Sequence, residues 1–235
     1  MAIRGIVFDK DGTLFDFTAT WSAWAMTFLG ELAAGDPDRA ALLGLAIGFD
    51  TRAVRFVPDS PVIGGTPGEL AEILLPLIPG TTASALVGRM NATSATAPMV
   101  EAAPLAPLLA DLRARGLKLG VATNDGEVPA RAHLRAAGVE DSFDFIAGFD
   151  SGHGSKPGPG QLRAFAEAAG LDPAEVVMVG DSAHDLHAAR AAGMRGVAVL
   201  TGIAEAPALS MLAEVVLPSI AHLPAWLEAE ALALA

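Results

Sequence analysis

Two pairs of acidic residues stand shortly after apolar stretches of the chain. Asp9 and Asp11 follow the run IVF, and Asp181 and Asp185, four residues apart, follow the run VVMVG. A carboxylate at the end of a buried strand costs free energy unless a metal ion or a cationic side chain meets it. Aspartates are also common as turn and helix-capping residues. Two acids after a fully apolar strand favour a site that binds a cation.

Two further polar segments contain side chains of types that contact anions. Thr123 and Asn124 precede a helix-length segment, where they would cap the helix, bind an anion, or do both. Lys156 would supply positive charge, although a single Lys is more often solvated. Local positive charge matters because the chain has 15 basic and 27 acidic residues, and its net charge of −12 opposes an anionic substrate.

The segment DKDG also occurs in some calcium-binding loops, but the sequence excludes that alternative. An EF-hand loop counted from Asp9 needs Gly at its sixth position and Glu at its twelfth. This chain has Leu14 and Thr20 at those positions. The DKDG segment is therefore not part of an EF-hand.

The segments that must position these side chains alternate between short apolar runs and longer helical patterns. Strands are predicted at 3–8, 117–121, 143–149, 176–179 and 197–200. Helices are predicted at 105–115, 128–137, 159–169 and 185–192. This alternation predicts an α/β fold with right-handed crossovers and a parallel sheet covered on both faces. Ligands bind beyond the carboxyl ends of such strands, near which the four polar segments stand.

The sequence between the first strand and the rest of the sheet is of a different kind. Helical patterns cover 21–32, 39–47 and 69–78, and the stretch 51–68 is rich in Pro and Gly. We therefore expect an all-helical domain inserted at 17–97, and a core domain formed by 1–16 and 98–235. Trp21 and Trp24, three residues apart, would pack inside the inserted domain or form a wall for a substrate.

In this order and at these places, the segments DKDGTL, TN, KP and GDSAHD resemble the four motifs of the haloacid dehalogenase-like hydrolases. The resemblance covers most of residues 1–16 and 103–202. It implies a Rossmann-like core of three layers with a parallel sheet. It also implies that the inserted domain is the C1 helical cap, which closes over the active site. The overall organisation is similar to that of phosphoglycolate phosphatases.

The resemblance implies catalytic roles for three residues. Asp9 would attack phosphorus and form an aspartyl-phosphate, which water then hydrolyses. Asp11 would protonate the leaving group and then activate the water. Lys156 and Mg²⁺ would offset the repulsion between Asp9 and the phosphate, about 4 kcal/mol for two unit charges 4 Å apart at an effective dielectric of 20. Family dehalogenases lack a carboxylate at the second position, so Asp11 indicates phosphoryl transfer.

The resemblance also implies a magnesium site. The ion would bind a carboxylate oxygen of Asp9, the backbone carbonyl oxygen of Asp11, and Asp181. Asp185 would lie behind these ligands and orient a water molecule or Lys156. The cofactor expected from the sequence is therefore Mg²⁺.

Substrate contacts are expected from both domains. Thr123 and the N–H groups around Asn124 and Gly12 would bind the transferring oxygens. In the cap, Arg55 would hold a substrate carboxylate, as 2-phosphoglycolate requires, although an Arg in a polar loop is more often solvated.

Three functions are compatible with this interpretation. The leading hypothesis is a Mg²⁺-dependent phosphatase acting on a small phosphate monoester, with 2-phosphoglycolate as the first candidate. The second is a phosphomutase resembling β-phosphoglucomutase, and the third is a non-catalytic module that binds phosphate or a partner. A phosphonatase would need a Schiff-base Lys in the cap, and residues 17–97 contain no Lys.

Composition narrows the expected partners and compartment. The acidic chain has no basic stripe for nucleic acid, and it has no apolar run of the ~20 residues that span a membrane. The N-terminal segment does not have the pattern of a signal peptide. The lack of Cys excludes disulfides, thiolate zinc sites and Cys nucleophiles. We expect a cytoplasmic monomer or homodimer whose partner is a small phosphorylated metabolite.

Overall fold

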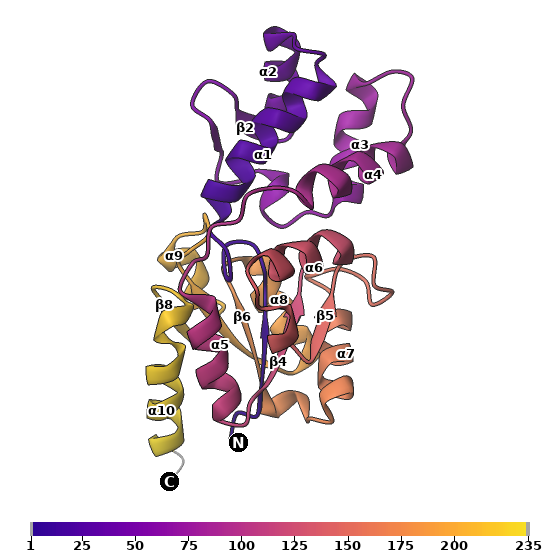
Figure 1. The fold of residues 1–235 in the computed structure, drawn as a ribbon. Coiled ribbons are helices and arrows are strands. Elements are labelled where there is room, and N and C mark those ends of the chain that lie inside the picture. Colours follow the sequence, from indigo (N-terminus) through magenta and orange to yellow (C-terminus); the bar gives the residue numbers. More distant parts are fainter. Residues whose placement is uncertain (1, 234–235) are drawn as a thin grey trace.

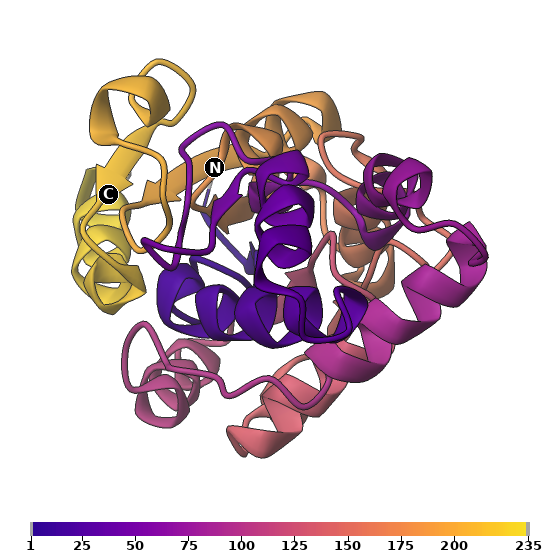
Figure 2. The ribbon, with the colours of Figure 1, turned by 90° about the horizontal axis from the view of Figure 1, so that it is seen from above.

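The structure of the protein is a computed structural model, which describes residues 2–233. Figure 1 shows a sheet with helices on its faces and, above one edge of this sheet, a smaller and mostly helical part. In the view from above, the smaller part lies over the sheet (Figure 2). We call the two parts the core and the cap.

The core sheet is parallel throughout and has the strand order β5-β4-β1-β6-β7-β8. Its strands are β1 (Gly5–Phe8), β4 (Lys118–Ala122), β5 (Phe145–Ala147), β6 (Val176–Gly180), β7 (Arg195–Val199) and β8 (Val215–Leu217). The chain leaves β1 toward β4 on one side and later returns to β6 on the other. The crevice at such a reversal of strand order is the usual ligand site of an open parallel sheet.

Helices cover both faces of this sheet, which confirms the predicted three-layer α/β core. They are α5 (Leu105–Ala114), α6 (Glu127–Ala136), α7 (Gly160–Ala169), α8 (Ala183–Ala192), α9 (Ala206–Leu209) and α10 (Leu223–Ala233). Ile6 and Phe8 of β1 pack in one apolar cluster with side chains of α5 and α10, whereas Val7 packs in another with side chains of α7 and α8. Alternate residues of a strand point to opposite faces, so a continuous apolar run suits a sheet that is buried on both sides.

The cap has its own apolar cluster, which includes Trp24, Phe28, Phe49 and Phe56. Its helices are α1 (Phe17–Leu32), α2 (Pro37–Ala46), α3 (Pro67–Leu74) and α4 (Ala83–Ser94), and its strands are β2 (Phe49–Asp50) and β3 (Arg55–Phe56). The expectation of an all-helical cap was therefore wrong, because β2 and β3 pair antiparallel. The paired rings of Phe49 and Phe56, whose centroids are 4.7 Å apart, are buried in the cap and hold this hairpin.

Short 3-10 helices complete the described secondary structure. They are Pro61–Ile63, Leu75–Leu77, Glu140–Ser142, Pro173–Glu175 and Ile220–His222. Within residues 2–233, no helix combines the length and the apolarity that crossing a bilayer requires.

The two segments that join the core to the cap lie side by side. The N–H of Asp16 donates to the carbonyl oxygen of Val100 at 2.8 Å, and the N–H of Ala102 donates to that of Leu14 at 2.9 Å. Asp16 also caps α1, because its carboxylate accepts from the N–H of Ala19. On this basis we propose that residues 17–97 form the cap and that the described residues of 1–16 and 98–235 form the core, as predicted from the sequence.

Candidate active site

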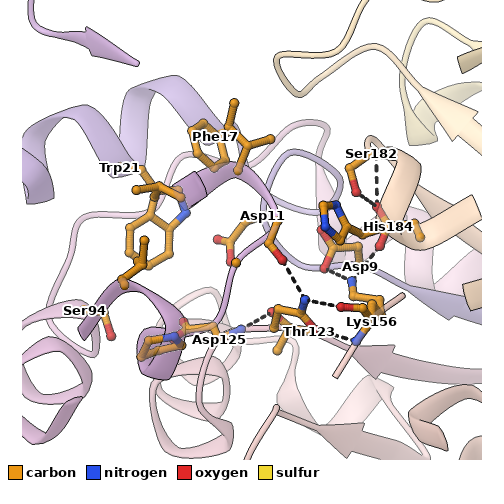
Figure 3. Close-up of a pocket in the computed structure, with 18 of the residues that line it drawn as sticks. Asp9, Asp11, Phe17, Trp21, Ser94, Thr123, Asp125, Lys156, Ser182 and His184 are labelled. Atoms are coloured by element: carbon orange, nitrogen blue, oxygen red, sulfur yellow. Dashed lines mark hydrogen bonds and ion pairs between the residues drawn. The ribbon is translucent and has the colours of Figure 1, made fainter. Parts of the chain in front are cut away.

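A pocket lies between the carboxyl ends of the central strands and the cap. Figure 3 shows Asp9, Thr123 and Lys156 on the core side, Phe17 and Trp21 on the cap side, and Asp11 between them. The core contributes Asp9, Asp11, Thr123, Asn124, Asp125, Lys156, Ser182, His184 and Asp185, which we call the core half. The cap contributes Phe17, Trp21, Trp24, Val62, Ile63, Gly64, Gly65, Pro67, Leu70, Met90 and Ser94, which we call the cap half.

The ammonium group of Lys156 joins two carboxylates of the core half. Its Nζ lies 2.6 Å from Oδ1 of Asp9 and 2.6 Å from Oδ1 of Asp185. The other oxygen of Asp185 accepts from the N–H and the hydroxyl of Ser182, so this carboxylate is held at both ends. Burial alone would lower the pKa of Lys156, yet the two carboxylates raise it above its ordinary value and keep the ammonium charged.

The loop that carries Lys156 is fixed by two buried amide side chains. Asn124 accepts from the N–H of Lys156 and donates to its carbonyl oxygen, both at 2.8 Å. Gln161 on α7 donates to the carbonyl oxygens of Thr123 and Gly154, each at 3.0 Å. The amide of Asn124 also donates to Gly64 of the cap at 2.7 Å. The side chain of Asn124 is therefore engaged in joining the lysine loop and the cap.

The carboxylate of Asp181, at the end of β6, lies close to the backbone of Gly12 and of Gly202. A Cβ atom at Gly12 or at Gly202 would collide with its carboxylate, and Gly12 has the left-handed φ of +79°. Glycine is the residue that allows both this conformation and this close approach. The hydroxyl of Thr201 donates to the carbonyl oxygen of Gly12 at 2.6 Å and fixes the loop.

Oxygen atoms of Asp9, Asp181 and Asp185 lie within 4.8 Å of one another. All three residues are buried, and burial is the main cause that raises the pKa of Asp9 to about 7 and that of Asp181 well above its usual range. The neighbouring carboxylates raise both pKa values further, and Lys156 opposes the rise. Lys156 thus pairs with two of these three buried carboxylates, Asp9 and Asp185.

This excess of buried negative charge fits a divalent cation. Carboxylate oxygens are hard ligands of the type that Mg²⁺ prefers. Asp185 is already held by Lys156 and Ser182, whereas Asp181 forms no ion pair with a Lys or Arg among residues 2–233. Asp9 and Asp181 are therefore the side chains best suited to hold the ion, with Asp185 behind them.

A second group of buried charges lies on the other side of Asp9. Lys10 is fully buried, and its Nζ lies 2.8 Å from Oδ1 of Asp11, 3.2 Å from Oδ2 of Asp125 and 3.0 Å from Nδ1 of His133. The same Nζ lies 5.4 Å from the centroid of the Trp21 ring. Burial alone would lower the pKa of Lys10, but Asp11 and Asp125 raise it. We call Lys10, Asp11, Asp125 and His133 the Lys10 network.

His133 connects the Lys10 network to the cap. Its Nε2 lies 2.6 Å from the carbonyl oxygen of Ser94, which can only accept, so the proton of the neutral ring is assigned to Nε2. Nδ1 then accepts from Lys10. Burial and the positive charge of Lys10 lower the pKa of His133 to about 4. The ring is consequently neutral near pH 7.

Two of the groups predicted to bind the transferring oxygens, the hydroxyl of Thr123 and the N–H of Gly12, differ in whether they are free to donate. Thr123 is buried, and its Oγ1 accepts from the N–H of Asp125 at 3.0 Å, which leaves the hydroxyl hydrogen to donate. The N–H of Gly12 donates to the carbonyl oxygen of Phe15 at 2.7 Å. That group therefore closes its own turn, in contrast to the expected contact with a substrate.

The cap half of the pocket is lined by aromatic and aliphatic side chains. The rings of Trp21 and Trp24 pack edge to face with centroids 5.2 Å apart, and both line the pocket (Figure 3 labels Trp21). They thus pack in the cap and also form a wall of the pocket. The indole N–H of Trp24 donates to the hydroxyl of Thr93 at 3.0 Å. Nε1 of Trp21 is buried and has no hydrogen-bond partner within the described residues.

Arg55 is the predicted substrate contact that the structure does not bring to the pocket. It lies on β3, is exposed, and is not among the lining residues. Its neighbour Phe56 points into the apolar cluster of the cap, and the alternation of a strand turns Arg55 to the opposite side. The structure therefore gives no support to Arg55 as a ligand for a substrate carboxylate.

Several residues of the site were not identified from the sequence. Lys10 stood inside the first motif, but its pairing with Asp125 and His133 joins positions more than one hundred residues apart. His133 and Gln161 lie within amphipathic helices, where a polar residue is ordinarily on the surface. A sequence signal existed only for Lys10, which stands between two acids after an apolar strand.

Comparisons with known proteins show which family the chain is similar to. The family model of the haloacid dehalogenase-like hydrolases matches residues 72–199. Phosphoglycolate phosphatase of Rhodospirillum rubrum is 40% identical over 120 residues, which are 51% of this chain and 50% of that protein. The match thus spans about half the length of this relative.

A second relative and a solved structure match over most of the chain. Phosphoglycolate phosphatase of Caulobacter vibrioides is 30% identical over 222 residues, 93% of this chain and 88% of that protein. The crystal structure of β-phosphoglucomutase from Clostridium difficile superimposes with a TM-score of 0.67 and 21% identity, and the match covers 93% of this chain and 92% of that one. At this identity the superposition shows the fold alone.

Proposed function

The chain belongs to the haloacid dehalogenase-like hydrolases, and from this we propose that it is a Mg²⁺-dependent phosphatase that hydrolyses a small phosphate monoester. The observation that carries the proposal is the contact of Asp9 with Lys156 beside the buried Asp181. A carboxylate in this position is a nucleophile for phosphorus, provided that positive charge offsets the repulsion by the phosphate.

In the first step, Oδ of Asp9 attacks phosphorus, an Asp9–phosphorus bond forms, and the ester oxygen leaves. Lys156 balances negative charge at the reacting carboxylate, and Asp185 and Ser182 keep the ammonium in place. When bound, Mg²⁺ would supply further positive charge and orient the phosphate. Asp9 and Asp181 would hold the ion.

Asp11 is the group that we assign to proton transfer. It lies between Asp9 and the cap half (Figure 3), where the ester oxygen of a bound substrate would leave. Its protonated carboxyl gives a proton to the leaving oxygen, and the resulting carboxylate takes one from the water that attacks the aspartyl-phosphate. The protonated ester oxygen thus leaves as the alcohol in the first step, and hydrolysis of the aspartyl-phosphate then yields inorganic phosphate and regenerates Asp9.

Donors for the phosphate oxygens are present around the nucleophile. The backbone N–H groups of Asp11 and Asn124 form no hydrogen bond within residues 2–233. The hydroxyl of Thr123 lines the pocket beside them. Preorganised donors of this kind stabilise the charge that develops on the transferring group.

The test is release of inorganic phosphate from a panel of phosphate monoesters, with Mg²⁺ and with EDTA. We expect turnover that requires Mg²⁺ and that falls by about 10⁴-fold or more in Asp9→Asn, because the variant lacks the nucleophile. Asp59→Asn, an exposed aspartate of the cap outside the pocket, is the matched control and should keep full activity. Undiminished turnover by Asp9→Asn, or none by the intact protein, would refute the proposal.

The phosphomutase alternative shares the core half and differs in what the cap must bind. A sugar bisphosphate would need hydrogen-bonding side chains for the hydroxyls and a cation for the second phosphate. The cap half offers mainly apolar side chains and contains no Lys or Arg. We therefore favour hydrolysis over transfer to a sugar.

A further inference from the structure

The cap half of the pocket has no basic side chain. Residues 17–97 contain no Lys and no His, and their four arginines are exposed and lie outside the pocket lining. These arginines are Arg39, Arg52, Arg55 and Arg89. The part of the pocket that would receive the alcohol portion of a substrate is consequently uncharged.

The two buried lysines of the core are already paired with carboxylates. Lys156 pairs with Asp9 and Asp185, and Lys10 pairs with Asp11 and Asp125. A buried carboxylate without a cationic partner costs several kcal/mol. A second anionic group on the substrate would therefore meet carboxylates and apolar walls instead of a counter-charge.

One buried polar group in the cap half has no hydrogen-bond partner among residues 2–233. Nε1 of Trp21 is a donor that lies on the side of the ring toward Asp11 (Figure 3). A buried N–H without an acceptor costs free energy, which an oxygen acceptor on a ligand would recover. The other walls, including Phe17, Ile63 and Met90, offer apolar contact only.

We propose that the substrate is a phosphate monoester of an uncharged and mainly apolar alcohol, such as an aryl or arylalkyl alcohol that bears a neutral oxygen acceptor. This inference rests on the proposed phosphatase function and narrows it. Esters with a carboxylate or a second phosphate beside the reacting group are poor substrates. That class includes 2-phosphoglycolate, the first candidate from the sequence.

The test compares esters that differ in charge and match in size. The pairs are 2-phosphoglycolate with 2-phosphoglycolamide, and 4-carboxybenzyl phosphate with 4-carbamoylbenzyl phosphate. With Mg²⁺ and the intact protein, we expect kcat/KM to favour the neutral member of each pair by about tenfold to hundredfold, since 1.4 kcal/mol is a factor of ten. Equal values, or a preference for the carboxylates, would overturn the inference.

Variants of the cap half test whether its lack of charge causes the preference for neutral esters. Val62 is a half-buried lining residue, and Val62→Lys should raise kcat/KM for the carboxylate esters about tenfold relative to Val62→Met, which adds length without charge. Arg55→Ala should leave both pairs unchanged because Arg55 lies outside the pocket. A selective loss of carboxylate ester turnover in Arg55→Ala would contradict the proposal.

His184 is the one basic side chain of the lining that forms no ion pair within the described residues. His184→Gln keeps a polar side chain at the rim and should leave the preference for neutral esters intact. If the intact protein instead prefers the carboxylates and His184→Gln loses this preference, His184 is the missing counter-charge and the inference is wrong.

A binding measurement separates this inference from the proposed function. The inactive Asp9→Asn protein with Mg²⁺ would be titrated with the same esters, and quenching of the tryptophan fluorescence would be measured, to which Trp21 and Trp24 of the pocket and Trp226 outside it contribute. Tighter binding of the neutral members supports the inference even if no ester is hydrolysed, in which case only the phosphatase proposal fails. Tighter binding of the carboxylates overturns the inference even if hydrolysis is observed.

Discussion

The core half and the cap half of the pocket face each other and differ in almost every physical property. The core half consists mainly of carboxylates, Lys156 and polar side chains held by buried hydrogen bonds. The cap half consists mainly of aromatic and aliphatic side chains. The core half is therefore suited to the chemistry of a phosphate group, and the cap half is suited to selecting what the phosphate is attached to.

The two halves are stabilised by different forces. In the core half, like charges are buried together and depend on the ammonium groups of Lys156 and Lys10 and on a metal ion. In the cap half, burial of apolar surface supplies the stability, at about 25 cal/mol per Å². Removing a charge from the core half should cost far more than removing a polar contact from the cap.

The largest effect is expected from Lys10→Met, which keeps the length of the side chain and removes its charge. Asp11 and Asp125 would then be buried without a cation, and we expect the free energy of unfolding to fall by about 3–5 kcal/mol. Denaturant titration measures this free energy of unfolding. Lys118→Met is the control, since Lys118 pairs with Asp144 while half exposed and should cost about 1 kcal/mol or less. Equal losses would show that the Lys10 network has no special role.

A pH dependence of stability is expected from His133. Its native pKa is about 4, below the ordinary 6.5, so the unfolded chain binds one more proton between these pH values. The free energy of unfolding should therefore decline as pH falls from 6.5 to 4, by about 3 kcal/mol from this residue, since one pKa unit is 1.36 kcal/mol. The free energy of unfolding would be measured at several pH values for the intact protein and for His133→Gln, and the difference between the two slopes gives the contribution of His133. A variant with the same slope as the intact protein would contradict this assignment.

Mg²⁺ should stabilise the protein through the core half alone. At a hundred times its Kd the ion would add about 2.7 kcal/mol to the free energy of unfolding, seen as a rise in Tm. Asp181→Asn should abolish most of this rise, because Asp181 is a buried carboxylate without a cationic side chain beside it. Asp59→Asn should keep the rise. A similar response in both variants would place the ion elsewhere.

The smallest effect is expected from Thr93→Val in the cap. The substitution keeps the shape of the side chain and leaves the indole N–H of Trp24 without its acceptor. We expect a loss of about 1–2 kcal/mol in the free energy of unfolding, with kcat changed little. Denaturant titration and a phosphatase assay of the same preparation check both parts. A large fall in kcat would mean that the cap half takes part in the chemistry beyond binding.

Much of the core could be predicted from the sequence. The apolar runs gave the five predicted strands, whose observed ends differ from the predicted ones by a few residues, while α9, β8 and α10 were not predicted. The carboxyl ends of parallel strands meet at one edge of a sheet, so a linear pattern was enough to place Asp9 near Thr123 in the pocket and near Asp181 in the cluster of carboxylates.

The cap was less predictable for physical reasons. Strands β2 and β3 have two residues each, which is too short for an alternating pattern, yet Phe49 and Phe56 pair because both are buried in the cap cluster. This pairing turns Arg55 outward. Helix α4 was also not predicted, and Met90 and Ser94 on that helix line the pocket.

The parallel sheet and the types of side chain at its edge follow from the order of residues along the chain, because the apolar pattern of each strand is a local property. Which charges pair depends on the packing of segments that are far apart in the chain. Lys10 meets His133 and Asp125, Asn124 joins Lys156 to Gly64, and the cap presents apolar side chains to the site. These contacts depend on how the cap and the helices pack on the sheet, and that packing is not recorded in any short segment of the chain.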